Sequence, residues 1–386
     1  MSFMAEAWGN GSCPDIVLAC MCLWLNHRDM MHKMSGGAER SIAEIGSRLS
    51  GMGFSVNLYS VNDGTLKDSD YFNGIKITRA SSNIIAHVSV PKLIKKVKPD
   101  VVIDDMAHAV PWLSSFFSNV PVVVYFRHMH ARTISGQLPF PQASAIKLIE
   151  KAYGIIYRNS TFVTESHSSE SDLVSLGIPK ERIRIILPGV DHKHFHPSAK
   201  SKTPSMVYFS GMRDYKRPWL ALSALAEARK KNANAGLNVV GKGPSTQKVM
   251  ESAKEGKMKG VKFCGKVPEK SLPKLISKSW VNLNFSVAEG FGYSILEAAS
   301  CGTPTIALDA HGVTETVEKY GFGKAIKEIG EFGEAYASIT ENISKVSKDV
   351  RKRSMKFDWD KCAKEWAALL KSVACEDTKE INKKVF

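Results

Sequence analysis

The amino-acid sequence predicts an α/β protein with two doubly wound domains, each built around a mainly parallel sheet. Short apolar runs alternate with helical patterns along most of the chain, the order that parallel strands and crossover helices produce. The length of 386 residues suits two domains of ordinary size. The alternation is interrupted near residue 197, in a stretch rich in Gly, Pro and polar residues. We therefore expect domains over residues 1–196 and 197–355, followed by a helical segment over 356–386 with a frayed end.

The first half of the chain contains five apolar runs of strand length. They are Ile16–Leu23, Val56–Val61, Val101–Ile103, Val120–Tyr125 and Phe162–Thr164. A strand whose two faces are both buried forms such a run, because neither face meets water. Between the first two runs, an amphipathic helix is indicated by apolar residues at helical spacing, namely Ala38, Ile42, Ile45 and Leu49.

The second half begins with a linker and repeats the pattern. Pro188–Pro197 and Ser198–Pro204 are rich in Pro, Ser and polar residues, which favours a loop. The strands expected after them are Met206–Phe209, Leu237–Val240, Val261–Phe263, Val281–Phe285 and Thr305–Ala307. A last helix is predicted over Phe357–Val373, with one apolar stripe formed by Trp359, Ala363, Trp366, Leu370 and Val373. Packing across a domain boundary and packing in an ordinary core both fit this stripe.

The composition excludes several classes of protein and points to an acidic partner. The chain is 44% hydrophobic and 24% charged, which excludes wholesale disorder and a small disulfide scaffold. The formal net charge is +15. Residues 1–195 hold 20 basic and 17 acidic side chains, whereas the rest hold 33 and 21. An acidic partner is therefore expected mainly against the second half.

The cysteines and the apolar runs indicate a cytoplasmic protein. Seven cysteines, an odd number without a Cys-x-x-Cys pair, predict reduced thiols rather than a disulfide framework or a zinc site. The longest early apolar run, Ile16–Leu25, is about ten residues, against the ~20 that a spanning helix needs. It also lacks the basic leader of a signal peptide. Peripheral attachment at the cytoplasmic membrane face stays open.

The stretch after the fourth strand of the second half carries the clearest chemistry. An apolar strand ends near Ser286, and the Gly-bearing turn Glu289–Gly292 opens a helix. Such a turn aims backbone N–H groups and the helix dipole at an anion. Glu297 follows Glu289 by eight residues, roughly two helical turns, so both carboxylates can line one side of a site. A carboxylate pair beside a phosphate cradle suits a sugar nucleotide, and a helix cap with a solvated glutamate is the alternative.

Several segments together resemble one family. Glu289 to Glu297 resembles the Glu-x₇-Glu motif of retaining GT-B glycosyltransferases of family 4, the glycosyl transferases group 1 type. Five further segments resemble that family in the expected order, namely Gly36–Arg40, Ile186–Pro197, Asn238–Pro244, Val261–Gly265 and Glu297–Ala307. The resemblance implies the GT-B fold, in which two Rossmann-like domains face a central cleft and a C-terminal helix crosses back to the first domain. It implies a retaining hexosyltransferase.

The resemblance also implies roles for residues of the predicted site. Glu289 contacts the donor sugar, and Glu297 binds the ribose hydroxyls. Backbone N–H groups near Phe291 and Gly292 meet the diphosphate, whose charge Lys216 and Arg213 neutralise. The remaining donor-binding positions are Gly290, Tyr293, Gly36, Gly37, Gly211, Lys266 and Val267. The sequence departs from the family at Met212, where the family has an Arg, and a short deletion would bring Arg213 into that place.

A histidine and the substrates complete what the resemblance implies. His128, at the end of a strand, matches the spacing of the family histidine better than His130 does. The donor is a nucleotide sugar, most simply a UDP- or GDP-sugar, and no metal or other cofactor is required. The acceptor is a glycan, a lipid-linked molecule or a small molecule, and peripheral contact with an anionic membrane fits the basic charge.

Two other patterns and three other functions compete with this interpretation. Asp358 and Asp360 form an Asp-x-Asp pair, but at a helix start the first Asp is ordinarily a cap. Lys254–Lys278 holds eight lysines with one aromatic residue, which favours a solvated basic face over nucleic-acid binding. A GT-B epimerase or hydrolase and a non-catalytic nucleotide-sugar-binding protein stay as alternatives. A Rossmann dehydrogenase is disfavoured, because no Gly-x-Gly-x-x-Gly follows the first strand.

Overall fold

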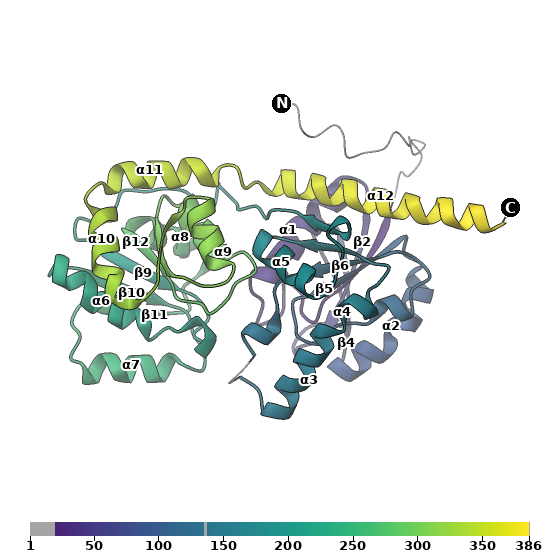
Figure 1. Cartoon of the computed structure of the whole chain (residues 1–386), viewed down its shortest axis with the longest axis horizontal. Coiled ribbons are helices and arrows are strands. Elements are labelled where there is room, and N and C mark those ends of the chain that lie inside the picture. The colour runs from purple at the N-terminus through teal and green to yellow at the C-terminus, as the bar shows by residue number, and fades with distance from the viewer. Residues whose placement is uncertain (1–19, 135–136, 386) are drawn as a thin grey trace. The chain divides into compact units, whose positions relative to one another are not determined.

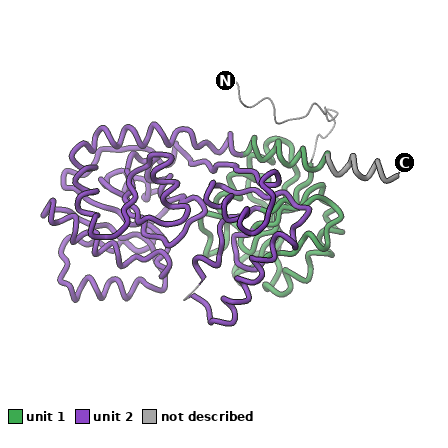
Figure 2. Tube along the Cα trace, in the orientation of Figure 1, with its two compact units in different colours: residues 1–105, 111–124, 363–386 green, residues 106–110, 125–362 purple. Residues whose placement is uncertain are grey.

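The chain forms two compact units in the computed structural model (Figure 1). The structure describes residues 20–134 and 137–385, with side chains as far as Cys375. Unit 1 comprises residues 1–105, 111–124 and 363–386, and unit 2 comprises residues 106–110 and 125–362 (Figure 2). The limits of these units are set by which residues contact one another, whereas each of the predicted domains, 1–196 and 197–355, holds one of the two sheets. The division at residue 197 stays a prediction.

An eight-stranded sheet has the order β3-β4-β2-β1-β5-β6-β7-β8. Its strands are β1 (Met21–Leu25), β2 (Ser55–Val61), β3 (Ser69–Phe72), β4 (Ile75–Ala80), β5 (Val101–Met106), β6 (Val122–Phe126), β7 (Thr161–Thr164) and β8 (Ile183–Ile185). β1 pairs in parallel with both β2 and β5, and the edge pair β3–β4 is antiparallel. The five predicted strands are present, but the edge strand β3 and its neighbour β4 were not predicted. Residues 16–19 of the first predicted strand lie outside the described residues, and the strand itself extends to Leu25.

Five helices connect these strands. They are α1 (Gly37–Gly51), α2 (Asn83–Val97), α3 (Phe140–Lys151), α4 (Tyr153–Ile156) and α5 (His167–Ser175). α1 forms where the spacing predicts it, with Ile42, Ile45 and Leu49 buried on one face. α2 begins after Ser82, whose side chain accepts a hydrogen bond from the amide of Ile85.

A six-stranded parallel sheet lies within unit 2, in the order β11-β10-β9-β12-β13-β14. Its strands are β9 (Ser205–Phe209), β10 (Gly236–Val240), β11 (Val261–Gly265), β12 (Val281–Asn284), β13 (Thr305–Leu308) and β14 (Gly323–Ile326). Counted from β9, this is the Rossmann order, which reverses direction between β9 and β12. Parallel sheets of this order bind ligands where the order reverses, beyond the carboxyl ends of the two central strands.

Helices cover both faces of this sheet. They are α6 (Leu220–Lys231), α7 (Thr246–Glu255), α8 (Leu272–Lys278), α9 (Tyr293–Ser300), α10 (Phe332–Thr340) and α11 (Ile343–Ser354). Successive side chains of β9 enter opposite cores: Met206 and Tyr208 pack with residues of α6 and α10, whereas Val207 and Phe209 pack with residues of α8 and α9. This alternation confirms the predicted doubly wound arrangement.

The last helix, α12 (Trp359–Val385), passes from unit 2 into unit 1 at residue 363. Trp366 is buried, and its ring centroid lies 5.6 Å from that of Trp24 in β1, so the second tryptophan of the predicted stripe packs inside unit 1. The first, Trp359, stacks with Tyr293 at 6.3 Å inside unit 2. Most of the end that we expect to fray has its side chains outside the described residues.

Asp358 caps α12, and its removal gives a stability prediction. Its Oδ1 accepts a hydrogen bond from the amide of Lys361 at 2.9 Å, the geometry of an N-cap. We expect Asp358→Ala to lower the free energy of unfolding by about 0.5–2 kcal/mol, because an amide of the first turn loses its acceptor. Chemical denaturation measures this loss. Asp358→Asn, which keeps an acceptor oxygen, is the control, and equal stability of parent and alanine variant would contradict the capping role.

The sequence also predicts reduced thiols and no membrane-spanning helix. Five described cysteines are free thiols as predicted, namely Cys20, Cys22, Cys264, Cys301 and Cys362. Cys375 is disulfide-bonded, so the expectation of reduced thiols is wrong at that position, because spacing along the chain does not reveal which thiols approach each other. Among the described residues, no helix combines the length and the apolar content needed to cross a membrane.

Candidate active site

The candidate site lies in unit 2, beyond the carboxyl ends of β9 and β12. β9 ends at Phe209 and β12 at Asn284, and the two strands pair in parallel with Leu283 beside Tyr208. Because parallel neighbours end at the same edge, the loops that follow them meet where the strand order reverses. One loop carries Lys216, and the other carries Glu289.

Lys216 and Glu289 form an ion pair at this edge. The Lys216 Nζ lies 2.5 Å from the Glu289 Oε1, which also accepts a hydrogen bond from the Ser286 hydroxyl at 2.7 Å. The two side chains keep 15% and 17% of their exposure, so the pair is shielded but reachable. Burial alone would lower the pKa of Lys216, but the Glu289 carboxylate outweighs it and raises that pKa. Lys216 is therefore a cation throughout the neutral range.

Glycines let the Glu289 turn pass close to other backbone. A Cβ at Gly290 would lie 2.2 Å from the carbonyl oxygen of Arg127, and one at Gly312 would lie 1.9 Å from that of Glu289. Gly292 precedes α9 with a φ of +90°, a conformation that favours glycine. No side-chain hydrogen bond caps α9 at Gly292, and the amide of Ile295 donates to the carbonyl of Gly292 at 2.9 Å. The positive end of the helix dipole therefore lies at this turn, and the binding of a diphosphate there stays a prediction.

The close approach at Gly290 predicts a steric effect. We expect Gly290→Ala to lower the free energy of unfolding by about 1–3 kcal/mol, because the new methyl group must displace the Arg127 backbone or the turn. Gly211→Ala is the matched control, since no atom lies within 4 Å of a Cβ at that loop position. Denaturation midpoints of the two variants provide the measurement. Equal midpoints would show that the turn relaxes without cost.

Cationic groups surround His128. Burial lowers the pKa of His128 well below its ordinary value, and His130, Lys216, Arg127 and His311 lower it further through their charges. Its ring centroid lies 4.7 Å from that of His130. His128 is therefore neutral at physiological pH, so it can both donate and accept a hydrogen bond. The charges of Lys216 and Arg127 in this set favour an anionic ligand near Lys216.

The residues of the Lys216 loop explain its departure from the family pattern. Met212 is fully buried in the hydrophobic core, and its amide donates to the carbonyl of Lys242 at 3.3 Å. Arg213 is half-buried, and its charge acts to lower the pKa of Lys216. Gly211 is exposed. Met212 thus packs into the core, and Arg213 is the first cationic side chain after it.

The predicted positions on α9 and β11 have different surroundings. Phe291 is buried in the core beneath α9, so only its backbone is available to a ligand. Glu297 is buried on the second turn of α9. The Tyr293 hydroxyl donates to the buried carboxylate of Glu165 rather than pointing freely outward. After β11, Lys266 is exposed and Val267 packs against the core.

Gly36 and Gly37 belong to unit 1 rather than to unit 2. Gly36 precedes α1, and its amide donates to the Glu39 Oε2 at 2.7 Å. The N-terminus of α1 thus already holds a carboxylate from its own first turn. A part for Gly36 and Gly37 in donor binding stays a prediction.

Sequence reasoning missed a second network near the site. Asp172 on α5 pairs with Arg132 at 2.6 Å and with the His311 Nε2 at 2.8 Å. The carbonyl of His311 accepts a hydrogen bond from the amide of Glu289 at 3.0 Å, so the network is connected to the Glu289 turn. Burial would raise the pKa of Asp172, but His311 and Arg132 lower it overall. Large separations in the chain left no local signal for these contacts.

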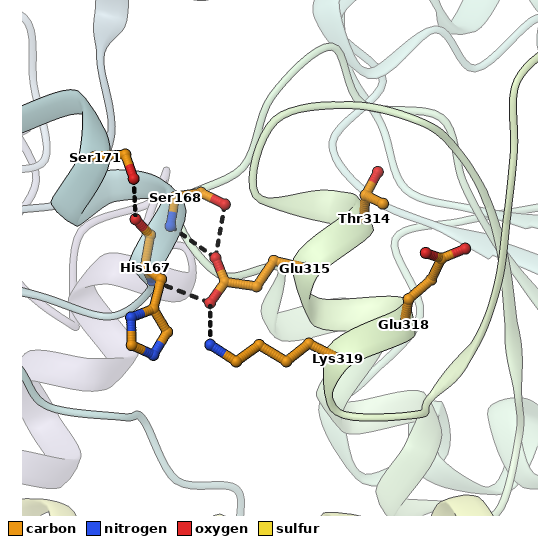
Figure 3. Close-up of a pocket in the computed structure, with 7 residues that line it drawn as sticks. All are labelled: His167, Ser168, Ser171, Thr314, Glu315, Glu318 and Lys319. Carbon is orange, nitrogen blue, oxygen red and sulfur yellow. Dashed lines mark hydrogen bonds and ion pairs between the residues drawn. The ribbon is translucent and has the colours of Figure 1, made fainter. Parts of the chain in front are cut away.

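A shallow pocket of about 410 Å³ lies between α5 and the π-helical turn η6 (Glu315–Lys319). Figure 3 shows the Glu315 carboxylate directed at the start of α5, where it accepts the amides of His167 and Ser168 and the Ser168 hydroxyl. These bonds lower the pKa of Glu315 against the opposing effect of burial. The pocket contains none of the predicted site residues. The described residues also hold no group of three or more side chains suited to a metal ion.

Solved structures identify the class of fold. A sucrose-phosphate synthase from Thermosynechococcus elongatus aligns with a TM-score of 0.76 at 19% identity, covering 92% of this chain and 99% of that one. Anabaena Alr3699/HepE in complex with UDP-glucose aligns with a TM-score of 0.71 at 18% identity, covering 91% and 99%. At these identities the likeness concerns the fold alone. With the two parallel sheets, it confirms the predicted GT-B fold of two Rossmann-like parts.

Two family models cover most of the chain. Residues 35–194 match the model described as Glycosyltransferase Family 4, and residues 190–361 match Glycosyl transferases group 1. The chain therefore belongs to glycosyltransferase family 4 of the group 1 type, as the motifs indicate. A probable sucrose-phosphate synthase of Thermosipho melanesiensis is 30% identical over 209 residues, which is 50% of this chain and 48% of that protein. The alignment thus spans about half the length of this relative.

Proposed function

We propose that the chain is a retaining glycosyltransferase that moves a hexosyl group from a nucleotide sugar to an acceptor. The observation that carries this proposal is the Lys216–Glu289 ion pair at the strand reversal, beside the uncapped start of α9. An ammonium and the positive end of a helix dipole suit a departing diphosphate, and the carboxylate suits sugar hydroxyls. Membership in family 4 supports the same activity.

The leaving diphosphate is stabilised by Lys216, Arg213 and the amides near Phe291 and Gly292. In the structure Lys216 contacts Glu289, but an ammonium has three donors, so it can contact a phosphate oxygen while it keeps the carboxylate. As the bond between the sugar and the diphosphate breaks, negative charge grows on the phosphate and the sugar carbon becomes oxocarbenium-like. Fixed cations and dipoles at that place lower the barrier. The acceptor hydroxyl then attacks from the face that the diphosphate leaves, which retains the configuration, and its proton passes to an oxygen of the departing phosphate.

Other side chains of unit 2 orient the donor. Glu289 and neutral His128 hold the sugar by hydrogen bonds, and Glu297 holds the ribose. The remaining donor contacts that we propose in unit 2 are Gly290, the backbone of Tyr293, Gly211, Lys266 and Val267. A part for Gly36 and Gly37 in donor binding stays a prediction from the family resemblance. We propose UDP- and GDP-sugars as the donor classes. The bound UDP-glucose in Alr3699/HepE supports the first. No metal is part of this scheme.

The acceptor that we propose is a glycan or a lipid-linked molecule, reached by a cytoplasmic protein in peripheral contact with an anionic membrane. Helix α2 supports the membrane contact. Ile84 and Val88 are 77% and 70% exposed on its first turns, and Lys92, Lys95 and Lys96 are exposed on its last turns. Exposed apolar side chains beside lysines are typical of helices that lie on anionic lipid.

A panel of nucleoside diphosphates tests the proposed donor site. A ligand that binds only the folded state raises the melting temperature, by an amount that grows with its concentration relative to Kd. We expect UDP or GDP to raise the melting temperature of the parent and to raise that of Lys216→Ala much less. A product screen with UDP- and GDP-sugars follows. Binding without transfer to any glycan, lipid or water acceptor would favour a non-catalytic binding protein, and free sugar alone would favour a hydrolase.

A further inference from the structure

Glu165 is a buried carboxylate at the end of β7, and three donors meet it. Its Oε1 accepts hydrogen bonds from the Tyr125 hydroxyl at 2.5 Å, from the Arg127 guanidinium at 3.0 Å and from the Tyr293 hydroxyl. Glu165 and Tyr125 are both almost completely buried. Because a buried carboxylate requires a counter-charge and hydrogen-bond donors, this set is satisfied as a unit. Burial also raises the pKa of Tyr125 well above its ordinary value, so its phenol stays a donor.

The three donors come from the two segments that frame the candidate site. Arg127 immediately precedes His128, and its guanidinium carbon lies 3.5 Å from the centroid of the Tyr125 ring. Tyr293 immediately follows Gly292 and is the first residue of α9. The same two segments also meet at Gly290, whose α-carbon faces the carbonyl of Arg127. All of these residues belong to unit 2.

We propose that Glu165 and Tyr293 form a positioning pair that holds the start of α9 at a fixed distance from His128. The proposal rests on the proposed function, because it assigns the diphosphate to α9 and the donor sugar to His128. Neither member of the pair touches the reacting atoms. Their bond sets the geometry between the leaving group and the sugar, and displacement of about 1 Å there can lower the rate by about 10²-fold.

Tyr293→Phe tests the pair, since it removes the hydroxyl and keeps the ring that stacks with Trp359. We expect kcat to fall by at least about tenfold, because the bond between Tyr293 and Glu165 is lost. The calorimetric Kd for UDP or GDP should stay within about threefold, because the substitution leaves α9 and the Tyr293 backbone, the part proposed to contact the donor, unchanged. Tyr336→Phe is the matched control: it removes another buried tyrosine hydroxyl in the same unit and should leave kcat unchanged. A purely structural role of the Tyr293 hydroxyl would lower stability without separating kcat from nucleotide affinity.

Glu165→Gln and the double variant complete the test. If the two residues act through one bond, the loss of kcat in the double variant is no larger than the greater single loss. A loss of kcat in the double variant equal to the product of the two single losses would overturn the proposal. An unchanged kcat in folded Tyr293→Phe, or an equal loss of nucleotide affinity and kcat, would also overturn it. If Glu165→Gln does not fold, the split between kcat and Kd in Tyr293→Phe still decides it. An inactive parent would instead overturn the proposed function, so the two failures are distinguishable.

Discussion

Lys216→Ala is expected to lower kcat by about 10²–10³-fold, because it removes a fixed cation from the departing diphosphate. In the folded protein this ammonium lies 2.5 Å from Glu289, so its position is set before the donor arrives. A group that is already in place needs no reorganisation as charge develops, which is why such donors have large effects. Steady-state kinetics at saturating donor, scaled to the folded fraction, provides the measurement.

Two comparisons separate this chemical effect from a loss of stability. The alanine variant leaves the shielded Glu289 without its counter-ion, so some destabilisation is expected as well. Lys270→Ala removes an exposed lysine of the same unit and controls for the change in net charge. Lys216→Arg keeps the charge and should recover part of the loss, although its planar head has a different geometry. A kcat for Lys216→Ala within a few-fold of the parent would contradict the assignment.

Glu289→Gln is expected to lower kcat by about 10²-fold with little loss of affinity for a nucleoside diphosphate. The free diphosphate lacks the sugar that Glu289 is proposed to hold, so binding of the diphosphate does not report this contact. Glutamine keeps the shape and loses the charge, which also releases Lys216 from its partner. Removal of one electrostatic contact of a transition state typically has an effect of this size. Calorimetry and kinetics on the same preparation give both quantities.

Glu297→Gln is the counterpart of this variant. Glu297 lies on the second turn of α9, where the ribose is proposed to bind. The glutamine variant should therefore weaken nucleotide affinity more than it lowers kcat. Equal losses of nucleotide affinity in the two glutamine variants would contradict the division of roles between the carboxylates.

The sequence predicts the central strands well and the sheet edge poorly. Val101–Ile103 is wholly apolar, and Val281–Phe285 is apolar except for the buried Asn282 and Asn284, because both faces of a central parallel strand are buried. The antiparallel edge pair β3–β4 has mixed burial and several polar residues, so its pattern resembles that of a loop. The apolar stripe of Phe357–Val373 predicts the last helix from the sequence. Which tryptophan packs in which unit depends on contacts with residues far away in the sequence, and spacing does not encode these contacts.

The same limit applies to the site. Glu289, Gly292 and Lys216 were found because turn chemistry and local motifs mark them. Tyr293 contacts Glu165, which lies 128 positions away in the sequence, and no local sequence pattern predicts that contact. Folding brings these residues together through the order of the parallel strands, so only the structure could reveal them.

Transfer from an α-linked nucleotide sugar, followed by NMR of the product's anomeric proton, tests the central claim most directly. The parent should form a product of retained α configuration with a UDP- or GDP-sugar, and Lys216→Ala should form the same product at about 10²–10³-fold lower rate. Inverted product, or a rate that does not depend on Lys216, would contradict a retaining transfer in which this lysine carries the leaving charge.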